Sequence, residues 1–150
     1  VVTDGSNSFW ATPFEIGDEF GGKEFIPPKN IFTEYHRGDD AAKDAFSIDN
    51  TTIAIVATDL ELSKVELKRI SVAAHDGMSR AILPSHTPYD GDLIFAASTG
   101  RKKIEIEPSD IYNIGNAAAI CLSRAIARGV YEAKSEKNDL LPTWQDIENL

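Results

Sequence analysis

The chain has 150 residues and a formal net charge of −9, with 42% hydrophobic and 26% charged residues. This length and composition predict one ordinary globular domain, or a large piece of one, with a real core. The negative charge argues against binding to nucleic acid or to an anionic membrane surface. No apolar run approaches the roughly 20 residues of a membrane helix. The single cysteine, Cys121, cannot form an internal disulfide, so we expect a cytoplasmic protein.

The first third of the chain has an irregular pattern. Residues 1–33 contain a glycine pair, a proline pair and scattered aromatic residues without a helical or strand period. We expect this segment to lie over a neighbouring core, with its aromatic side chains as anchors. Residues 34–50 are acidic and rich in small residues, which predicts a mobile surface loop. Because the sequence begins at Val1 rather than at methionine, we expect it to be part of a longer polypeptide.

From residue 51 the pattern becomes regular. The apolar, β-branched run 51–58 predicts a strand that is covered on both faces. A helix follows over 63–83, where Ser63 and Glu66 have the spacing of a capping box. Pro84 should end this helix.

The second half of the chain predicts another strand and another helix. Residues 93–99 indicate a buried strand, 100–101 a turn, and the alternating residues 102–107 a half-exposed antiparallel strand. A long alanine-rich helix is predicted over 110–133, and a charged tail follows it. The order of these elements indicates an α/β fold with helix-covered sheets, and no dinucleotide or phosphate-binding glycine motif is present.

Thr51 is a candidate nucleophile, because it lies where the acidic loop meets a buried strand. If the bond between Asn50 and Thr51 were cut, Thr51 would carry a free α-amine beside its own hydroxyl. An α-amine with a pKa of about 7.7–8.0 can accept the hydroxyl proton near neutral pH without a histidine. The alternative is a purely structural threonine, since β-branched residues are common in strands.

A second candidate is the acidic pair Asp90 and Asp92, on a glycine turn before a buried strand. On strand sites i and i+2 the carboxylates would point the same way, so that one could orient a nucleophile while the other adjusts charge. Ordinary turn chemistry is the alternative. With His86 the pair could also ligate a metal ion. A serine triad of Ser85, His86 and Asp90 is a further possibility, although the serine lies on no recognisable nucleophile elbow.

Two other reactive residue types have simpler interpretations. His75 lies on the first predicted helix, where we expect a packed or partly exposed histidine. Cys121 lies among alanines in the middle of the second helix. It is therefore predicted to be a core residue rather than a reactive thiol.

Several stretches together resemble one known family. They are 50–59, 67–69, 74–82, 86–87, 90–92 and 95–100. In this order they are similar to the P1 (DmpA-like) peptidase family. That family includes L-aminopeptidase/D-esterases, β-peptidyl aminopeptidases and the nylon-degrading 6-aminohexanoate-oligomer hydrolases. The resemblance is dense from residue 50 to about residue 127, and looser over 1–33, which look like the end of the family's large subunit.

The resemblance implies a precursor that cuts itself into a large α and a small β subunit. Asn50 would end the large subunit, so that residues 1–50 belong to it and residues 51–150 form the small subunit. Thr51 would be the nucleophile at the new N-terminus. Threonine after asparagine looks like the nylon-oligomer branch, in which Asp90 and Asp92 match an acidic pair beside the nucleophile. The implied fold is a four-layer α/β/β/α sandwich, of which this chain would be the C-terminal part.

The implied activity is hydrolysis of small linear amides, such as 6-aminohexanoate oligomers, through an acyl-enzyme and without a metal or other cofactor. An aminopeptidase/D-esterase, a β-peptidyl aminopeptidase and acyl transfer like that of ornithine acetyltransferases remain alternatives. A non-enzymatic packing subunit with an intact Asn50–Thr51 bond is another.

The resemblance also implies protein partners. The first is the protein's own large subunit, whose oxyanion-hole residues would precede Val1. The others are further αβ units in a homo-oligomer, for which the tail around Trp144 is a plausible contact.

Overall fold

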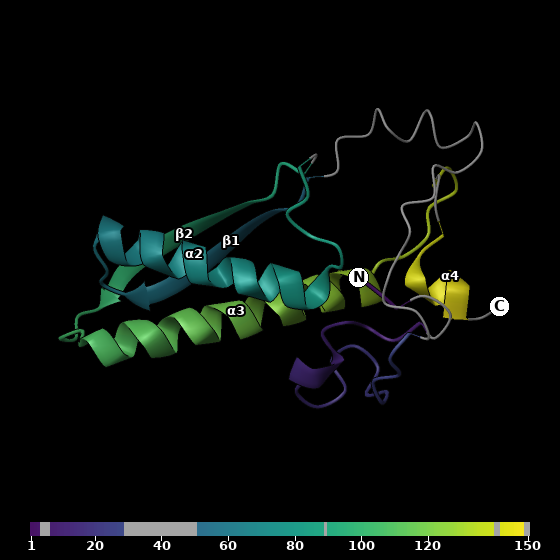
Figure 1. Cartoon of the computed structure of the whole chain (residues 1–150), viewed down its shortest axis with the longest axis horizontal. Helices are drawn as coiled ribbons and strands as arrows, with labels where there is room; N and C mark the ends of the chain where they lie inside the picture. The colour runs from purple at the N-terminus through teal and green to yellow at the C-terminus, as the bar shows by residue number, and fades with distance from the viewer. Residues whose placement is uncertain (4–6, 29–50, 89, 140–141, 149–150) are drawn as a thin grey trace.

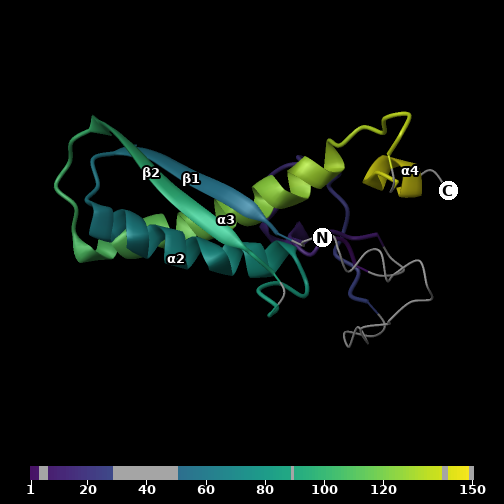
Figure 2. The same cartoon turned by 90° about the horizontal axis from the view of Figure 1, so that it is seen from above.

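A computed structural model of the chain describes residues 1–3, 7–28, 51–88, 90–139 and 142–148. Its elements are η1 (Thr12–Phe14), β1 (Ile53–Leu60), α2 (Lys64–Ala81), β2 (Leu93–Lys102), α3 (Pro108–Tyr131) and α4 (Trp144–Glu148). The two strands form a parallel sheet, and the long helices α2 and α3 run along one side of it (Figures 1 and 2). This arrangement confirms the α/β class. The predicted mobile loop 34–50 lies outside the described residues.

The sheet buries one of its faces. Ala54 and Val56 of β1 and Ile94 of β2 face the helices and pack with Met78 and Leu122 in a hydrophobic cluster. The alternate positions of the two strands point away from the helices, as the period of two requires. Four large apolar side chains on that side are exposed in the described part of the chain, namely Ile53, Ile55, Leu93 and Phe95. The described residues therefore cover one face of the strands, and cover on the second face stays a prediction.

These exposed side chains are paired across the sheet. Ile53 lies opposite Leu93, and Ile55 lies opposite Phe95. The result is a continuous apolar surface rather than scattered exposed residues, and we call these four side chains the open sheet face.

The second strand is longer than the sequence predicts. β2 continues through Gly100 and Arg101 to Lys102, so the predicted turn is wrong, and 103–107 form no strand. The extension follows from contacts with the end of β1. The amide of Glu61 donates to the carbonyl of Lys102 at 2.8 Å, and the Lys102 ammonium lies 2.9 Å from the Asp59 carboxylate.

Both long helices begin at sequence signals. Ser63 caps α2, where its hydroxyl accepts from the Glu66 amide at 3.3 Å and the Glu66 carboxylate accepts from the Ser63 amide at 2.7 Å. The predicted capping box is therefore confirmed. Helix α2 ends at Ala81, somewhat before Pro84. Helix α3 begins at Pro108, which suits the first helical turn because a proline lacks the amide proton.

Helices α2 and α3 cross at small residues. A Cβ added to Gly77 of α2 would lie 2.1 Å from the carbonyl oxygen of Ala119 of α3, so only glycine allows this approach. On the other helix, a Cβ on Gly115 would lie 3.1 Å from the Cβ of Ala73. Backbone-to-backbone packing of this kind places α2 against both the sheet and α3.

The N-terminal segment and α4 share a second core. Phe9, Phe20 and Trp144 are buried there, with the Phe9 ring 5.5 Å from Phe20 and 5.3 Å from Trp144. The expected role of Phe9 and Phe20 as aromatic anchors is confirmed. Trp144 itself faces this core, because the residue is 8% exposed and its indole N–H donates to the Asn7 carbonyl at 3.2 Å, while the contact of the tail with another subunit stays a prediction.

An ion pair also ties the N-terminal segment to α3. The Arg124 guanidinium donates to both carboxylate oxygens of Glu19, with Nη2 at 2.8 Å from Oε2. This hydrogen-bonded pairing lowers the pKa of Glu19 and raises the pKa of Arg124. Bidentate geometry makes it stronger than an ordinary surface pair.

Cys121 is exposed, which corrects the prediction of a core residue. It shares one side of α3 with Ala117 and Ala125 at four-residue spacing. These three residues line an apolar groove of about 380 Å³ next to β1. The described residues leave that side of the helix open. None of the helices in the described ranges is long and apolar enough to cross a membrane.

The helix crossing predicts opposite effects for two glycine substitutions. Gly77→Ala should lower the free energy of unfolding by about 1–3 kcal/mol, because the new methyl group overlaps the Ala119 backbone. Gly129→Ala on α3 is the matched control, since its Cβ meets nothing within 4 Å. That control should raise the free energy of unfolding by about 0.5–1 kcal/mol through helix propensity. Urea denaturation of the full-length protein measures both, and equal effects would contradict the crossing.

Candidate active site

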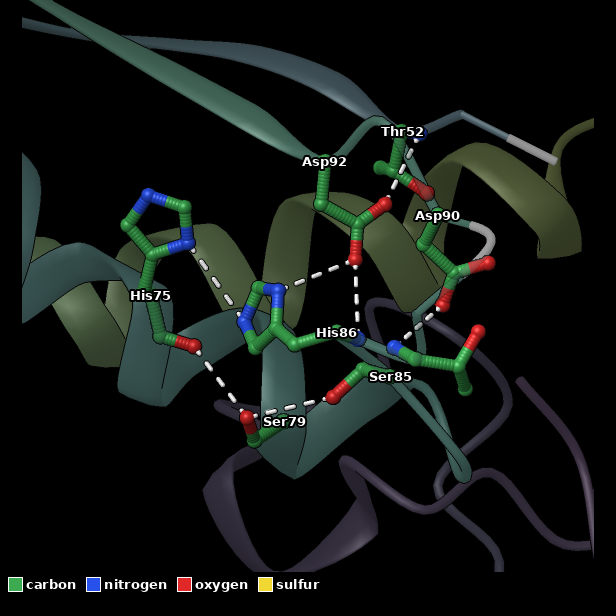
Figure 3. Close-up of polar contacts among 8 residues, drawn as sticks. Thr52, His75, Ser79, Ser85, His86, Asp90 and Asp92 are labelled. Carbon is green, nitrogen blue, oxygen red and sulfur yellow. Dashed lines mark hydrogen bonds and ion pairs between the residues drawn. The ribbon is translucent and has the colours of Figure 1, made fainter. Parts of the chain in front are cut away.

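The candidate site lies where both strands begin (Figure 3). Because β1 and β2 are parallel, their N-terminal ends meet at the same edge of the sheet, with Thr52 beside Asp92 and Leu93. The Leu93 amide donates to the Thr52 carbonyl at 3.0 Å. The Thr52 amide donates to Oδ1 of Asp92 at 3.0 Å. These two hydrogen bonds fix Asp92 and Leu93 to Thr52, the residue that follows Thr51.

Thr51 itself is exposed at this edge. Gly91 lies against it, and a Cβ added to Gly91 would be 2.8 Å from the Thr51 hydroxyl oxygen. The glycine of the acidic turn therefore permits a close approach to the candidate nucleophile. Asn50, the predicted end of the large subunit, lies outside the described residues.

Asp92 is the most constrained group of the site. Its side chain is only 7% exposed, and both of its oxygens have partners. While Oδ1 accepts from Thr52, Oδ2 accepts from the His86 amide at 3.1 Å and lies 3.0 Å from Nδ1 of the same residue. A carboxylate with so little water around it needs such donors, because an unpaired buried charge is costly.

His86 contacts Asp92 with both its backbone and its ring. Its φ of 56° lies in the left-handed region, which is uncommon for a residue other than glycine. This backbone conformation accompanies the double contact of the amide and Nδ1 with one carboxylate oxygen (Figure 3).

A second histidine, His75, contacts the ring of His86. Nδ1 of His75, on α2, lies 3.4 Å from Nε2 of His86, and the two ring centroids are 4.8 Å apart. Burial lowers the pKa of His75, and the charge on His86 lowers it further, while Asp92 acts in the opposite direction. The expectation of a partly exposed helical histidine is confirmed, since His75 is half-buried. Its link to the site is a finding of the structure.

Asp90 makes a different set of contacts. Its Oδ2 accepts from the Thr87 amide at 2.8 Å, and its own amide donates to the Thr87 carbonyl at 3.0 Å. Asp90 therefore closes the turn that carries Gly91. Both acidic residues precede β2, which begins at Leu93. The two residues therefore do not occupy strand sites as predicted. Their carboxylates accept from different amides.

The other arrangements considered from the sequence are not formed. The Ser85 hydroxyl donates to Ser79 at 3.2 Å, and His86 turns to Asp92 rather than to Asp90, so the serine triad is absent. No group of three or more His, Cys, Asp or Glu side chains in the described part of the chain is placed to hold a metal ion.

Comparison with known proteins identifies the family. The match to peptidase family S58 covers residues 16–139. The chain belongs to this family. The resemblance inferred from the residues is thereby confirmed.

Relatives with curated names include two kinds of protein. An uncharacterized aminopeptidase of Mycobacterium leprae is 37% identical over 96% of this chain and 40% of its own length. One from Mycobacterium tuberculosis is 40% identical over 65% of this chain and 31% of its own length. The 6-aminohexanoate-oligomer endohydrolase of Paenarthrobacter ureafaciens is 39% identical over 39% of this chain and 17% of its own length. The chain thus spans at most about two fifths of the aminopeptidases that it matches.

The environment of His75 predicts a loss of stability in acid. Because the pKa of His75 in the folded chain lies below 6.5, the unfolded chain binds its proton more tightly. Stability from this group is complete above about pH 6.5 and falls as the pH drops toward the lowered pKa. His75→Gln should reduce the dependence of the free energy of unfolding on pH in this window. Urea titrations of the full-length protein at several pH values measure it, and an unchanged slope would contradict the assignment.

Proposed function

We propose that this chain carries the nucleophile of a self-processing amide hydrolase, with Thr51 as the first residue of the small subunit after cleavage from Asn50. The observation that carries the proposal is the position of Thr51, exposed against Gly91 and next to the amide that Asp92 holds. Membership of a peptidase family supports amide chemistry. The division into residues 1–50 and 51–150 follows from the same proposal.

Self-cleavage begins within the precursor. The Thr51 hydroxyl attacks the carbonyl carbon of Asn50 and gives up its proton, and the peptide C–N bond breaks as an ester forms. Water then hydrolyses the ester, which releases the Asn50 carboxylate and leaves Thr51 with a free amine and its hydroxyl. The hydroxyl proton ends on the Thr51 nitrogen as the C–N bond breaks, and only the cleaved form has a free α-amine that can serve as its own base without a histidine.

Substrate hydrolysis repeats the chemistry in trans. The α-amine, with a pKa of about 7.7–8.0, takes the hydroxyl proton while the oxygen attacks the substrate carbonyl. The amine product leaves with a proton, and water hydrolyses the acyl-enzyme. Asp92 orients the backbone beside the nucleophile, and Asp90 holds the turn that places Gly91. Donors for the oxyanion would come from the large subunit, each worth about 2.7–4 kcal/mol in comparable enzymes.

The open sheet face supports the proposed four-layer sandwich. Ile53, Ile55, Leu93 and Phe95 present a paired apolar surface that no described residue covers. A second sheet from the large subunit would bury it, and burying each such side chain is worth roughly 1.5–3 kcal/mol. The partners proposed are therefore the protein's own large subunit and further αβ units, in the cytoplasm.

The substrates proposed are small linear amides. A relative that acts on 6-aminohexanoate oligomers favours internal cleavage of such chains. Aminopeptidase activity is the second candidate, favoured by a relative that matches 96% of this chain. Mass spectrometry of the products separates them, because internal cleavage gives shorter oligomers and an aminopeptidase releases single N-terminal residues. Added acceptor amine would increase product only in an acyl transferase.

Intact mass spectrometry of the full-length protein tests the nucleophile. The wild type should give a fragment that begins at Thr51, and Thr51→Ala should stay whole because it lacks the attacking oxygen. Thr52→Ala is the matched control, since its amide can still donate to Asp92 and the fragment should appear. An uncut wild type, or cleavage in Thr51→Ala, would overturn the proposal and favour a packing subunit.

The contact of Gly91 with Thr51 gives a second test. Gly91→Ala should slow both self-cleavage and amide hydrolysis by roughly 10- to 100-fold, because the added methyl group displaces the Thr51 hydroxyl. The midpoint of thermal unfolding should change little, because the displaced group lies at the exposed edge of the sheet. Gly129→Ala, whose added Cβ meets nothing within 4 Å, is the control for a glycine-to-alanine change away from the site. Unchanged rates in Gly91→Ala would exclude a close approach of this turn to the nucleophile.

A further inference from the structure

We propose that His86, supported by His75, is a positioning residue for the amide hydrolysis proposed above, and that it acts by holding the Asp92 carboxylate on the amide that follows the nucleophile. This inference rests on the proposed function of Thr51. It adds a role for two histidines that the N-terminal threonine chemistry does not itself require.

The first step of the argument is the number of donors on Asp92. Thr52 supplies one at 3.0 Å on Oδ1, and His86 supplies its amide at 3.1 Å and its ring at 3.0 Å on Oδ2. His86 therefore provides most of what compensates this nearly buried charge. Without the imidazole, Oδ2 would keep only the backbone amide of residue 86 and lose the ring donor at 3.0 Å, so the carboxylate would gain by turning toward water and away from the Thr52 amide.

The second step is the backbone of His86. A left-handed conformation at a residue other than glycine persists only where the surroundings determine it. Here it accompanies the simultaneous contact of the amide and the ring with one oxygen. The strain therefore coincides with the contact that orients Asp92.

The third step is the proton count along the two rings. The contact with Asp92 requires a proton on Nδ1 of His86. In the neutral ring Nε2 is then an acceptor, and Nδ1 of His75 can donate to it across 3.4 Å. The contact between the two rings therefore needs an N–H on one of the facing nitrogens and a lone pair on the other.

The surroundings of His75 favour its neutral form. Burial and the charge on His86 lower its pKa, as does Lys68, whereas Asp92 and Asp76 raise it. A neutral His75 can keep the His86 ring in one orientation whether or not His86 is charged, because its Nδ1 can donate or accept. His75 thus acts on Asp92 through His86.

Amide hydrogen exchange at Thr52 tests the positioning directly, without relying on activity. In full-length His86→Ala this amide should exchange at least about tenfold faster than in the wild type, because its acceptor Asp92 loses the ring contact that holds it in place. His86→Asn should retain slow exchange, since asparagine tolerates the left-handed region and its amide can donate to Asp92. Ser85→Ala, whose hydroxyl bonds to Ser79 instead, is the matched control and should behave as the wild type. Equal exchange in all variants would overturn the proposal.

Activity and histidine NMR complete the test. Hydrolysis of a linear 6-aminohexanoate oligomer or an aminoacyl anilide should fall roughly 10- to 100-fold in His86→Ala and recover largely in His86→Asn. Nitrogen NMR of labelled histidines should show the proton of His86 on Nδ1, and Asp92→Asn should shift that signal. Rates equal to the wild type in His86→Ala would overturn the role, as would a proton on Nε2 alone. If Thr51→Ala still cleaves itself, the proposed function fails, while Thr52 exchange still decides whether His86 positions Asp92.

Discussion

The parallel pairing of β1 with β2 is the constraint on which the rest of this structure depends. Because both strands run in the same direction, their first residues meet at one edge, and Thr52 lies beside Asp92. Helix α2 makes the crossover between them, and its glycine allows it to pack closely on α3. The loop that carries Asp92 follows α2 and leads into β2. The helix that packs on α3 and the loop that forms the site therefore belong to the same β1–α2–β2 unit.

A nearly buried carboxylate organises the chemistry at this edge. Asp92 must be compensated where it lies, because a charge without donors in such surroundings would be destabilising. Its donors come from two different parts of the chain, namely the residue before β1 and the loop after α2, and His75 of α2 contacts the His86 ring. The same requirement that keeps Asp92 in place thus holds the backbone beside Thr51. In the proposed mechanism, compensation of this buried charge would also orient the backbone beside the nucleophile.

The apolar side chains of the described residues form two different kinds of surface. Phe9, Phe20 and Trp144 bury one another at the far end of α3, and Arg124 secures that segment through Glu19. The open sheet face has no such cover among the described residues. Both surfaces are apolar, and they differ in whether residues of the described ranges supply the covering side chains.

Local patterns in the sequence determined the helices, the starts of the strands and the candidate Thr51, because capping, periodicity and β-branched runs act over a few neighbouring residues. The ordered motifs also identified the family. Only the tertiary structure decided that β2 runs on to Lys102, that Trp144 turns inward, and that His75 and His86 join Asp92. These contacts join residues from different elements, and no local spacing reports which side chains a parallel crossover will bring together. The acidic pair was visible in the sequence, but only the fold decided which backbone amides donate to each of the two carboxylates.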